Sequence, residues 1–150
     1  KSALDDGHID SYIADFPVPE IAGHPRVKLT PHLGASTQEA EENCAIMAAQ
    51  QLTDFLETGN IKNSVNFPEV NLEPTGGSRL AITNRNIPGA LGQITSILAK
   101  HKINVVDMLN KSREEVAYNL IDIAEEIEGD LLQDLGGLGT VISAREFQIV

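Results

Sequence analysis

The sequence predicts two folded parts, an α/β piece with a long helix followed by a small α+β domain. Two short apolar or β-branched runs before residue 35 flank a proline-rich loop, and a helical pattern follows. Residues 60–77 are rich in Asn, Pro and Gly, which is typical of a linker. In residues 78–150 strand and helix patterns alternate in the order β-α-β-β-α-β, which indicates a ferredoxin-like domain.

Composition excludes several classes of partner. A formal net charge of −11 repels phosphate backbones and anionic lipids, so we expect no nucleic acid and no membrane partner. The single cysteine excludes an internal disulfide, and we expect a cytoplasmic protein. The sequence opens at Lys1 within a helical pattern, so we expect it to belong to a longer chain.

The first part, residues 1–59, is expected to contain the closing strands of an α/β sheet at 9–14 and 27–30. A long helix should then start at Ser36 with Glu39 completing a capping box, and end at Thr58. Six residues recur at helical spacing and predict one apolar stripe, which places the cysteine in a core. They are Cys44, Met47, Ala48, Leu52, Phe55 and Leu56. We expect a partner to cover this helix.

The second part should have one face of its sheet covered by two helices, leaving the other face and the edges for a partner. The strands are expected at 80–84, 103–109, 116–123 and 140–149, and the helices at 88–101 and 127–135. A polar turn containing residues 111–113 should join the two middle strands.

His32 is the titratable residue best placed for chemistry. It follows a β-branched strand and precedes a helix start, and α/β sheets place active sites at the carboxyl ends of their strands. The helix start and Gly34 offer room and positive potential for an anionic ligand group. With a carboxylate from Glu20 or Asp15 to orient it, the imidazole could exchange a proton with a substrate hydroxyl. The alternative is a turn histidine with local hydrogen bonds only.

The stretch TPHLGAST at 30–37 resembles the signature around the acid/base histidine of the D-isomer-specific 2-hydroxyacid dehydrogenases. Asp15 and Glu20 match that family's D-x-x-x-x-E spacing, although Phe16 stands one position early and Ile21 follows the glutamate. The resemblance implies a Rossmann-type core with NAD as cofactor. It also implies that Glu20 pairs with His32 and that Asp15 lies near the nicotinamide.

The segment NSVNFPEV after the helix resembles the branch of that family that oxidises 3-phosphoglycerate in serine biosynthesis. The resemblance implies an NAD-dependent oxidoreductase as the parent enzyme. The glycine-rich NAD loop and the substrate-anchoring arginine of the family are not matched in these 150 residues, so we expect this chain alone to be inactive. The GGLG at 136–139 follows a helical pattern and opens a strand, which is the reverse of a dinucleotide loop.

The motif N-x-P-G-x-L at 86–91 and the triplet Ile-Asn-Val at 103–105 resemble the signature of ACT domains, which sense amino acids. The expected effector-binding residues are Asn84, Asn86, Pro88, Gly89 and Asn104. L-Serine is the first candidate effector, and the sheet is expected to form a homo-oligomer. Asn84 stands where serine-regulated relatives carry a histidine, which leaves the effector open.

Three alternatives remain open from the sequence. These asparagine, proline and glycine residues also serve turns and caps in any fold. The chain could instead be a stand-alone ACT amino-acid-binding module, or a structural dimerisation domain without a ligand. No metal site is expected, because the histidines and acidic pairs stand at no metal-ligand spacing.

Overall fold

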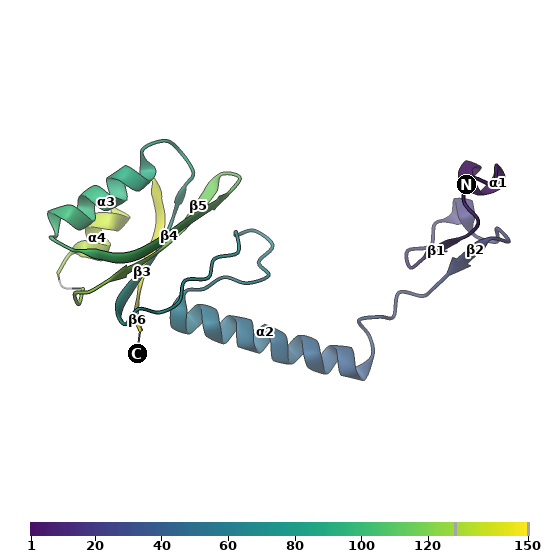
Figure 1. Ribbon diagram of the computed structural model, residues 1–150, viewed down its shortest axis with the longest axis horizontal. Coiled ribbons are helices and arrows are strands. Elements are labelled where there is room, and N and C mark those ends of the chain that lie inside the picture. The colour runs from purple at the N-terminus through teal and green to yellow at the C-terminus, as the bar shows by residue number, and fades with distance from the viewer. Residues whose placement is uncertain (128, 150) are drawn as a thin grey trace. The chain divides into compact units, whose positions relative to one another are not determined.

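The computed structural model describes residues 1–127 and 129–149 (Figure 1). Two compact units, Lys1–Ala48 and Ala49–Val150, meet inside helix α2 (Gln38–Thr58). Residues 128 and 150, which fall in the predicted second helix and at the end of the second domain, lie outside the described residues. The predicted boundaries at 59 and 77 remain predictions. No helix in the described part of the chain is long and apolar enough to cross a membrane.

The first unit contains a two-stranded parallel sheet. Strand β1 (Tyr12–Ala14) pairs with β2 (Val27–Leu29), so their carboxyl ends lie at the same edge. The Thr30 amide extends the pairing by donating to the Ala14 carbonyl at 3.0 Å. A short helix α1 (Ser2–Asp5) precedes the strands, and a 3₁₀ turn (Pro19–Ile21) connects them. The expected strands are therefore present and parallel.

The N-cap of helix α2 (Gln38–Thr58) lies one residue later than the sequence predicts. The Thr37 hydroxyl accepts a hydrogen bond from the Ala40 amide at 3.1 Å, and the Thr37 carbonyl accepts from the Glu41 amide. Thr37 is therefore the N-cap, and the predicted capping box of Ser36 and Glu39 is wrong. Ser36 and Thr37 are adjacent hydroxyl residues, and either could cap the helix. The Ser36 amide closes a turn on the Leu33 carbonyl, which leaves Thr37 as the residue next to the helix.

The end of α2 is set by Gly59, as predicted. Its φ of +76° is left-handed, and its amide donates to the Phe55 carbonyl at 3.0 Å. A Cβ at this position would lie 3.0 Å from both Leu120 and Phe147. Glycine is therefore required both by the backbone conformation and by the close approach of the sheet.

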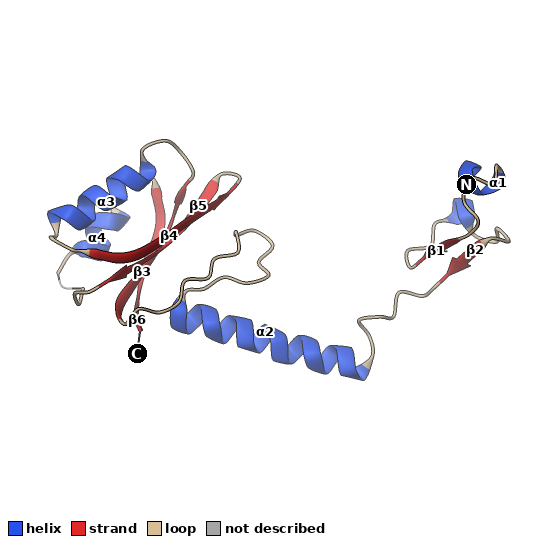
Figure 2. Cartoon of the chain, in the orientation of Figure 1, coloured by secondary structure: helices blue, strands red, loops and turns tan. Residues whose placement is uncertain are grey.

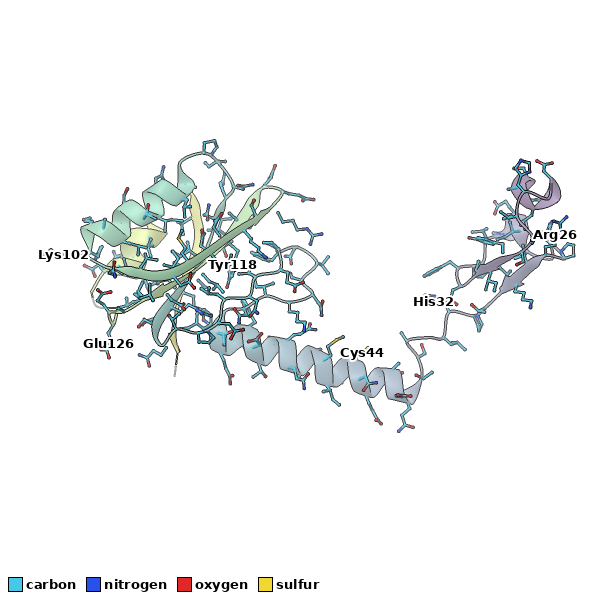
Figure 3. All side chains as sticks on the ribbon, viewed as in Figure 1. Arg26, His32, Cys44, Lys102, Tyr118 and Glu126 are labelled. Atoms are coloured by element: carbon cyan, nitrogen blue, oxygen red, sulfur yellow. The ribbon has the colours of Figure 1, made fainter. Side chains whose placement is uncertain are left out.

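The apolar stripe of α2 is exposed. No residue of the helix is buried, and Leu52 and Phe55 are among the exposed large side chains of the described chain. Cys44 is exposed as well and projects from the helix in Figure 3. The prediction that Cys44 lies in a core is therefore wrong, because the described residues do not cover this stripe.

The second unit has the predicted β-α-β-β-α-β order (Figure 2). Its elements are β3 (Gly77–Arg85), α3 (Ala90–Lys100), β4 (Val105–Arg113), β5 (Val116–Ile123), α4 (Leu131–Gly136) and β6 (Val141–Ile149). The strands are antiparallel in the order β4-β5-β3-β6. The two outer positions are held by β4 and β6, so these are the edges of the sheet. The ferredoxin-like prediction is confirmed.

Some boundaries differ from the prediction for local reasons. Helix α3 starts at Ala90, because Gly89 adopts a left-handed φ of +84° and the Ala90 amide closes a turn on the Ile87 carbonyl. The residues predicted as a polar turn, 111–113, continue β4. Glu114 and Glu115 form a two-residue hairpin instead, with Glu114 at φ +53°. Helix α4 starts at Leu131, four residues after the predicted start.

One face of the sheet packs against α3 and α4, which lie on the same side in Figure 1. Alternate residues of β3 and β5 point to this face, as the period of a strand requires. The buried core comprises Leu80, Ile82, Ile94, Leu98, Ile121, Ile123, Leu131 and Leu135. Burial of these aliphatic side chains is the main apolar contribution to the stability of this unit.

The opposite face of the sheet is also covered, which corrects the expectation of a bare face. Residues 59–75, here called the arm, fold back over it. Ile61 and Val70 form an antiparallel bridge with both amides donating, and Val70 is fully buried. Tyr118, labelled in Figure 3, donates its hydroxyl to the Gly59 carbonyl at 2.8 Å, and burial raises its pKa to about 12. The residues predicted as a linker therefore form part of the second core.

A buried ion pair fixes the arm to the sheet. Arg79 on β3 and Asp122 on β5 are 0% and 1% exposed. The guanidinium donates twice to Asp122 (2.5 and 2.9 Å), and to the carbonyls of Thr58 (3.0 Å) and Glu73 (3.2 Å). Burial opposes ionisation of Asp122, but hydrogen bonds from Arg79 and Thr75 outweigh it and hold its pKa below the usual value. One side chain thus joins the end of α2, the arm and the sheet.

We expect Arg79→Leu to destabilise the chain by about 3–5 kcal/mol, because it leaves the Asp122 carboxylate buried without a counter-ion. The double variant Arg79→Leu/Asp122→Leu should recover part of this loss, since no unpaired charge remains. Urea unfolding followed by circular dichroism measures both. Arg85→Leu, at an exposed arginine of the same strand, is the control and should change the free energy of unfolding by less than about 0.5 kcal/mol. Equal effects of Arg79→Leu and Arg85→Leu would contradict the anchoring role.

Candidate functional site

The carboxyl ends of β1 and β2 bring His32 and Asp15 together. The His32 Nδ1 atom lies 2.5 Å from one oxygen of Asp15. The other oxygen accepts hydrogen bonds from the Thr30 hydroxyl at 2.6 Å and from the His32 amide at 2.8 Å. The Phe16 ring stands 4.1 Å from the imidazole. Asp15 therefore holds both the backbone and the ring of His32.

The conformation and charge of this cluster suit a reactive site. His32 has a φ of +53°, in the left-handed region that residues other than glycine enter at a cost. The hydrogen bond from Thr30 is the largest effect on the pKa of Asp15 and lowers it. Desolvation opposes this, and the charge and hydrogen bonds of His32 lower the pKa further. Asp15 is thus held as a carboxylate, and its partner imidazole remains 54% exposed to a ligand.

Glu20 does not contact His32 in this structure. It lies in the 3₁₀ turn Pro19–Ile21, is exposed, and has no side-chain hydrogen bond among the described residues. The expected pairing of Glu20 with His32 is therefore replaced by one with Asp15. The physical reason is position: Asp15 directly follows β1 at the edge where β2 ends, whereas Glu20 lies beyond the intervening bend.

The described residues do not form an NAD site by themselves. Asp15, expected near the nicotinamide, uses both oxygens on Thr30 and His32. Gly34 faces open space, since a Cβ added there would have no neighbour within 4 Å. The glycines at 136–139 follow α4 and precede β6, and so do not open a helix toward a phosphate.

The expected effector loop lies between β3 and α3. Asn86 donates its side-chain amide to the Glu114 carbonyl at 2.9 Å, which ties the loop to the β4–β5 hairpin. Pro88 and Gly89 form the turn before α3. An open hollow of about 660 Å³ is lined by residues of the loop and the hairpin, Asn86 and Glu115 among them. This geometry leaves room beside the loop for a small molecule.

Asn104 lies at the other end of the sheet from this loop. It precedes Val105, which pairs with Ile123, whereas Asn84 pairs with Ala117 at the opposite end of β5. Six residues of a strand span about 20 Å. The backbone N–H of Asn104 donates to the Glu125 carboxylate at 3.3 Å. Within one chain, the five expected effector residues therefore do not form one small site.

The sequence analysis missed the partner of Asn84. Asn84 is 3% exposed and accepts a hydrogen bond from the fully buried Asn119, which in turn accepts one from Asn110. Asn119 occupies an inward position of β5 between aliphatic residues. A polar residue in the alternating apolar pattern of 117–123 is the signal that identifies it.

No protein-family model matches the chain. Curated relatives do match. D-3-phosphoglycerate dehydrogenase of Escherichia coli (strain K12) is 36% identical over 121 residues, 79% of this chain and 30% of the relative. D-3-phosphoglycerate dehydrogenase 2 of Saccharomyces cerevisiae is 34% identical over 117 residues, 75% of this chain and 24% of the relative. The chain thus spans less than a third of the length of these relatives.

Solved structures with local similarity include the ACT domain from GTP pyrophosphokinase of Chlorobium tepidum. It is 15% identical with a TM-score of 0.39, over 48% of this chain and 97% of that one. The regulatory subunit of aspartate kinase from Thermus thermophilus is 14% identical with a TM-score of 0.42, over 53% of this chain and 55% of that one.

The strand order and the two helices on one face define the second unit as a ferredoxin-like α+β domain. Over the matched residues, the chain is similar to D-3-phosphoglycerate dehydrogenases.

We expect His32→Ala to raise the pKa of Asp15, because it removes a hydrogen bond and a positive charge that favour the carboxylate. Thr30→Val should raise it as well, since the threonine hydroxyl is the strongest of these partners. Carbon-detected NMR titration of the Asp15 carboxyl measures both changes. His8→Ala, at an exposed histidine of the same unit, is the control and should leave the pKa of Asp15 unchanged. An Asp15 titration that His32→Ala does not move would contradict the pairing.

Proposed function

We propose that this chain is the histidine-bearing and regulatory region of an enzyme that oxidises 3-phosphoglycerate with NAD. The observation that carries the proposal is the 36% identity to a D-3-phosphoglycerate dehydrogenase over 79% of the chain. The His32–Asp15 pair at the carboxyl ends of two parallel strands agrees with the position that α/β enzymes give their active sites. Such an enzyme would act in the cytoplasm, in serine biosynthesis.

In this proposal His32 takes the proton from the substrate hydroxyl. Its Nδ1 atom faces Asp15, so Nε2 is the ring nitrogen left for the substrate. A carboxylate beside Nδ1 fixes the tautomer and stabilises the imidazolium that forms when the proton arrives. We assign this orienting role to Asp15 on the geometry, and keep Glu20 as the family-based alternative. Residues outside this chain would supply the NAD site and the substrate-anchoring arginine.

In the full-length enzyme we expect His32→Ala to lower kcat by about 10²–10⁴-fold, the usual contribution of general acid–base catalysis. Affinity for NAD should change little, because the imidazole acts on the substrate proton. Stopped-flow turnover and NADH fluorescence measure the two effects, with His8→Ala as the control. The 150-residue chain alone should show no turnover. A loss of kcat of less than about tenfold, with the chemical step rate-limiting, would mean that His32 is a turn residue and not the acid/base catalyst.

We also propose that the ACT-type unit binds an amino acid between two copies of the chain. Strand β4 is an edge strand, and it exposes Val105, Val106 and Met108 (36–51% exposed). Antiparallel pairing of two β4 edges would place the start of one β4, with Asn104, level with the end of the other. Asn84 lies at that same end of the sheet, with β5 between it and β4. Two chains would then supply the asparagines that one chain keeps apart.

If this is correct, the chain should dimerise, and L-serine should tighten the dimer, because a ligand that bridges two chains favours their association by mass action. Sedimentation at several protein concentrations, with and without L-serine or other amino acids, measures this. Val106→Lys on the β4 edge should weaken the dimer by placing like charges at the interface. Ile142→Lys, a similarly exposed residue on the β6 edge, is the matched control for the dimer measured without amino acids, because Ile142 also lines the hollow beside the loop.

If Ile142→Lys dissociates the dimer and Val106→Lys does not, the interface lies at the β6 edge and not at the β4 edge. A dimer that responds to no amino acid would favour a structural dimerisation domain without a ligand.

A further inference from the structure

Strand β4 is one edge of the sheet, and its charged side chains share one face. Leu109 pairs with Leu120 and packs against the core beneath the arm. Asp107 and Lys111 lie two residues before and after Leu109, so the pleat of the strand places them on this same arm-covered face. Arg113 follows on the same face at the end of the strand. Along β4 this face is therefore negative, apolar, positive and positive.

These charges are not neutralised within the chain. Asp107, Lys111 and Arg113 are exposed, and none of them forms an ion pair among the described residues. Asp107 accepts a hydrogen bond from the backbone N–H of the adjacent Met108 at 2.7 Å, which lays the carboxylate along the backbone of the edge strand. An edge strand with such charges can offer them to a second strand.

The order of the residues is complementary to itself. In a two-fold dimer the same surface meets its own copy, and two antiparallel strands pair residues that lie at equal distances from the axis. If Leu109 lies on the axis, Asp107 of each chain is opposite Lys111 of the other, and Arg113 is its diagonal neighbour. The two Leu109 side chains then meet between the two ion pairs.

Other registers of the same strand are less favourable. An axis at Asp107 or at Lys111 would place like charges directly opposite each other, which is destabilising. An axis at Asn110 would pair Asp107 with Arg113, but it would set Lys111 opposite Leu109 and lose the apolar contact. The charges and the leucine therefore favour one register.

The other edge of the sheet lacks this symmetry. The charged residues of β6 are Arg145 and Glu146, which are adjacent and so point to opposite faces. Two β6 strands related by a two-fold axis would therefore not place an acidic side chain opposite a basic one. Of the two edges, β4 is the one whose charges match those of a second copy.

We propose that Asp107 and Lys111 fix the register in which two β4 edges pair, with Leu109 of both chains at the two-fold axis. This inference rests on the proposed assembly of the chain through β4. On pairing, the Met108 N–H donates to the second strand and releases the Asp107 carboxylate toward Lys111 of the second copy. By symmetry each dimer contains two of these ion pairs.

Charge exchange in the 150-residue chain tests the proposal, with the dimer dissociation constant measured by sedimentation at low ionic strength. Asp107→Lys and Lys111→Asp should each weaken the dimer by about tenfold or more, because each replaces two attractive contacts with two repulsive ones. The double variant Asp107→Lys/Lys111→Asp restores the pairs and the net charge, and should dimerise within about threefold of the unmodified chain. Added salt should reduce the effect of each single reversal. Glu146→Lys, the same change of charge on the β6 edge, is the matched control.

Cross-linking measures the register directly and remains decisive if a charge reversal fails to fold. The background is Cys44→Ser, which removes the exposed native cysteine. Chains with Asp107→Cys, mixed with chains carrying Lys111→Cys, should form a disulfide-linked heterodimer, because opposite residues have Cβ atoms about 4.5–5.5 Å apart. Lys111→Cys alone should not link to itself, because the two copies are offset by four residues, about 13 Å along the strand.

Three results would overturn the register. One is cross-linking of Lys111→Cys to itself, or of Asp107→Cys to Arg113→Cys in preference to Lys111→Cys. Another is a dimer that Glu146→Lys weakens as much as Asp107→Lys does. The third is a dimer that Val106→Lys weakens and the charge reversals do not, which would leave the proposed assembly in place. A chain that stays monomeric at every concentration would overturn the proposed assembly, and the register with it.

Discussion

The buried pair of Arg79 and Asp122 is the interaction on which the second unit depends. A guanidinium taken out of water is stable only if its donors are satisfied, and here four of its N–H groups bind a carboxylate and two backbone carbonyls. Those carbonyls belong to the end of α2 and to the arm. The desolvated guanidinium therefore holds two segments outside the sheet in fixed positions. At the same place, the Tyr118 hydroxyl donates to the Gly59 carbonyl, and the lack of a side chain on Gly59 allows the close approach to the sheet. The arm is consequently part of the folded unit and not a tether.

The two faces of the sheet use polar groups in different ways. The arm-covered face holds a charged pair that connects segments, whereas the helix-covered face holds a neutral amide relay that orients one side chain. Both networks satisfy their donors and acceptors, and no buried side-chain nitrogen or oxygen in the described residues lacks a partner.

Local patterns in the sequence were sufficient to predict the element order of the second unit, the end of α2 at Gly59 and the strand that precedes His32. They failed where the outcome depends on distant residues. The Asn- and Pro-rich composition of the arm indicates a linker, yet Ile61 and Val70 are buried because Arg79 draws the arm onto the sheet. The residues alone left both Glu20 and Asp15 as partners of His32, and the family resemblance implied Glu20, whereas the bend after β1 leaves Asp15 beside the ring. The register of three strands, which no local pattern contains, determines the contact of Asn84 with Asn119.

Native-state hydrogen exchange of the Ile61 and Val70 amides tests the central claim most directly. Both amides donate across the arm, to each other's carbonyl. If Arg79 and Asp122 hold the arm in the folded unit, these amides should exchange as slowly as those of β3 and β5, through global unfolding. In Asp122→Asn they should exchange through a local opening of lower free energy while the sheet remains protected. Rapid exchange of both amides in the unmodified chain, at rates typical of an exposed loop, would contradict the account.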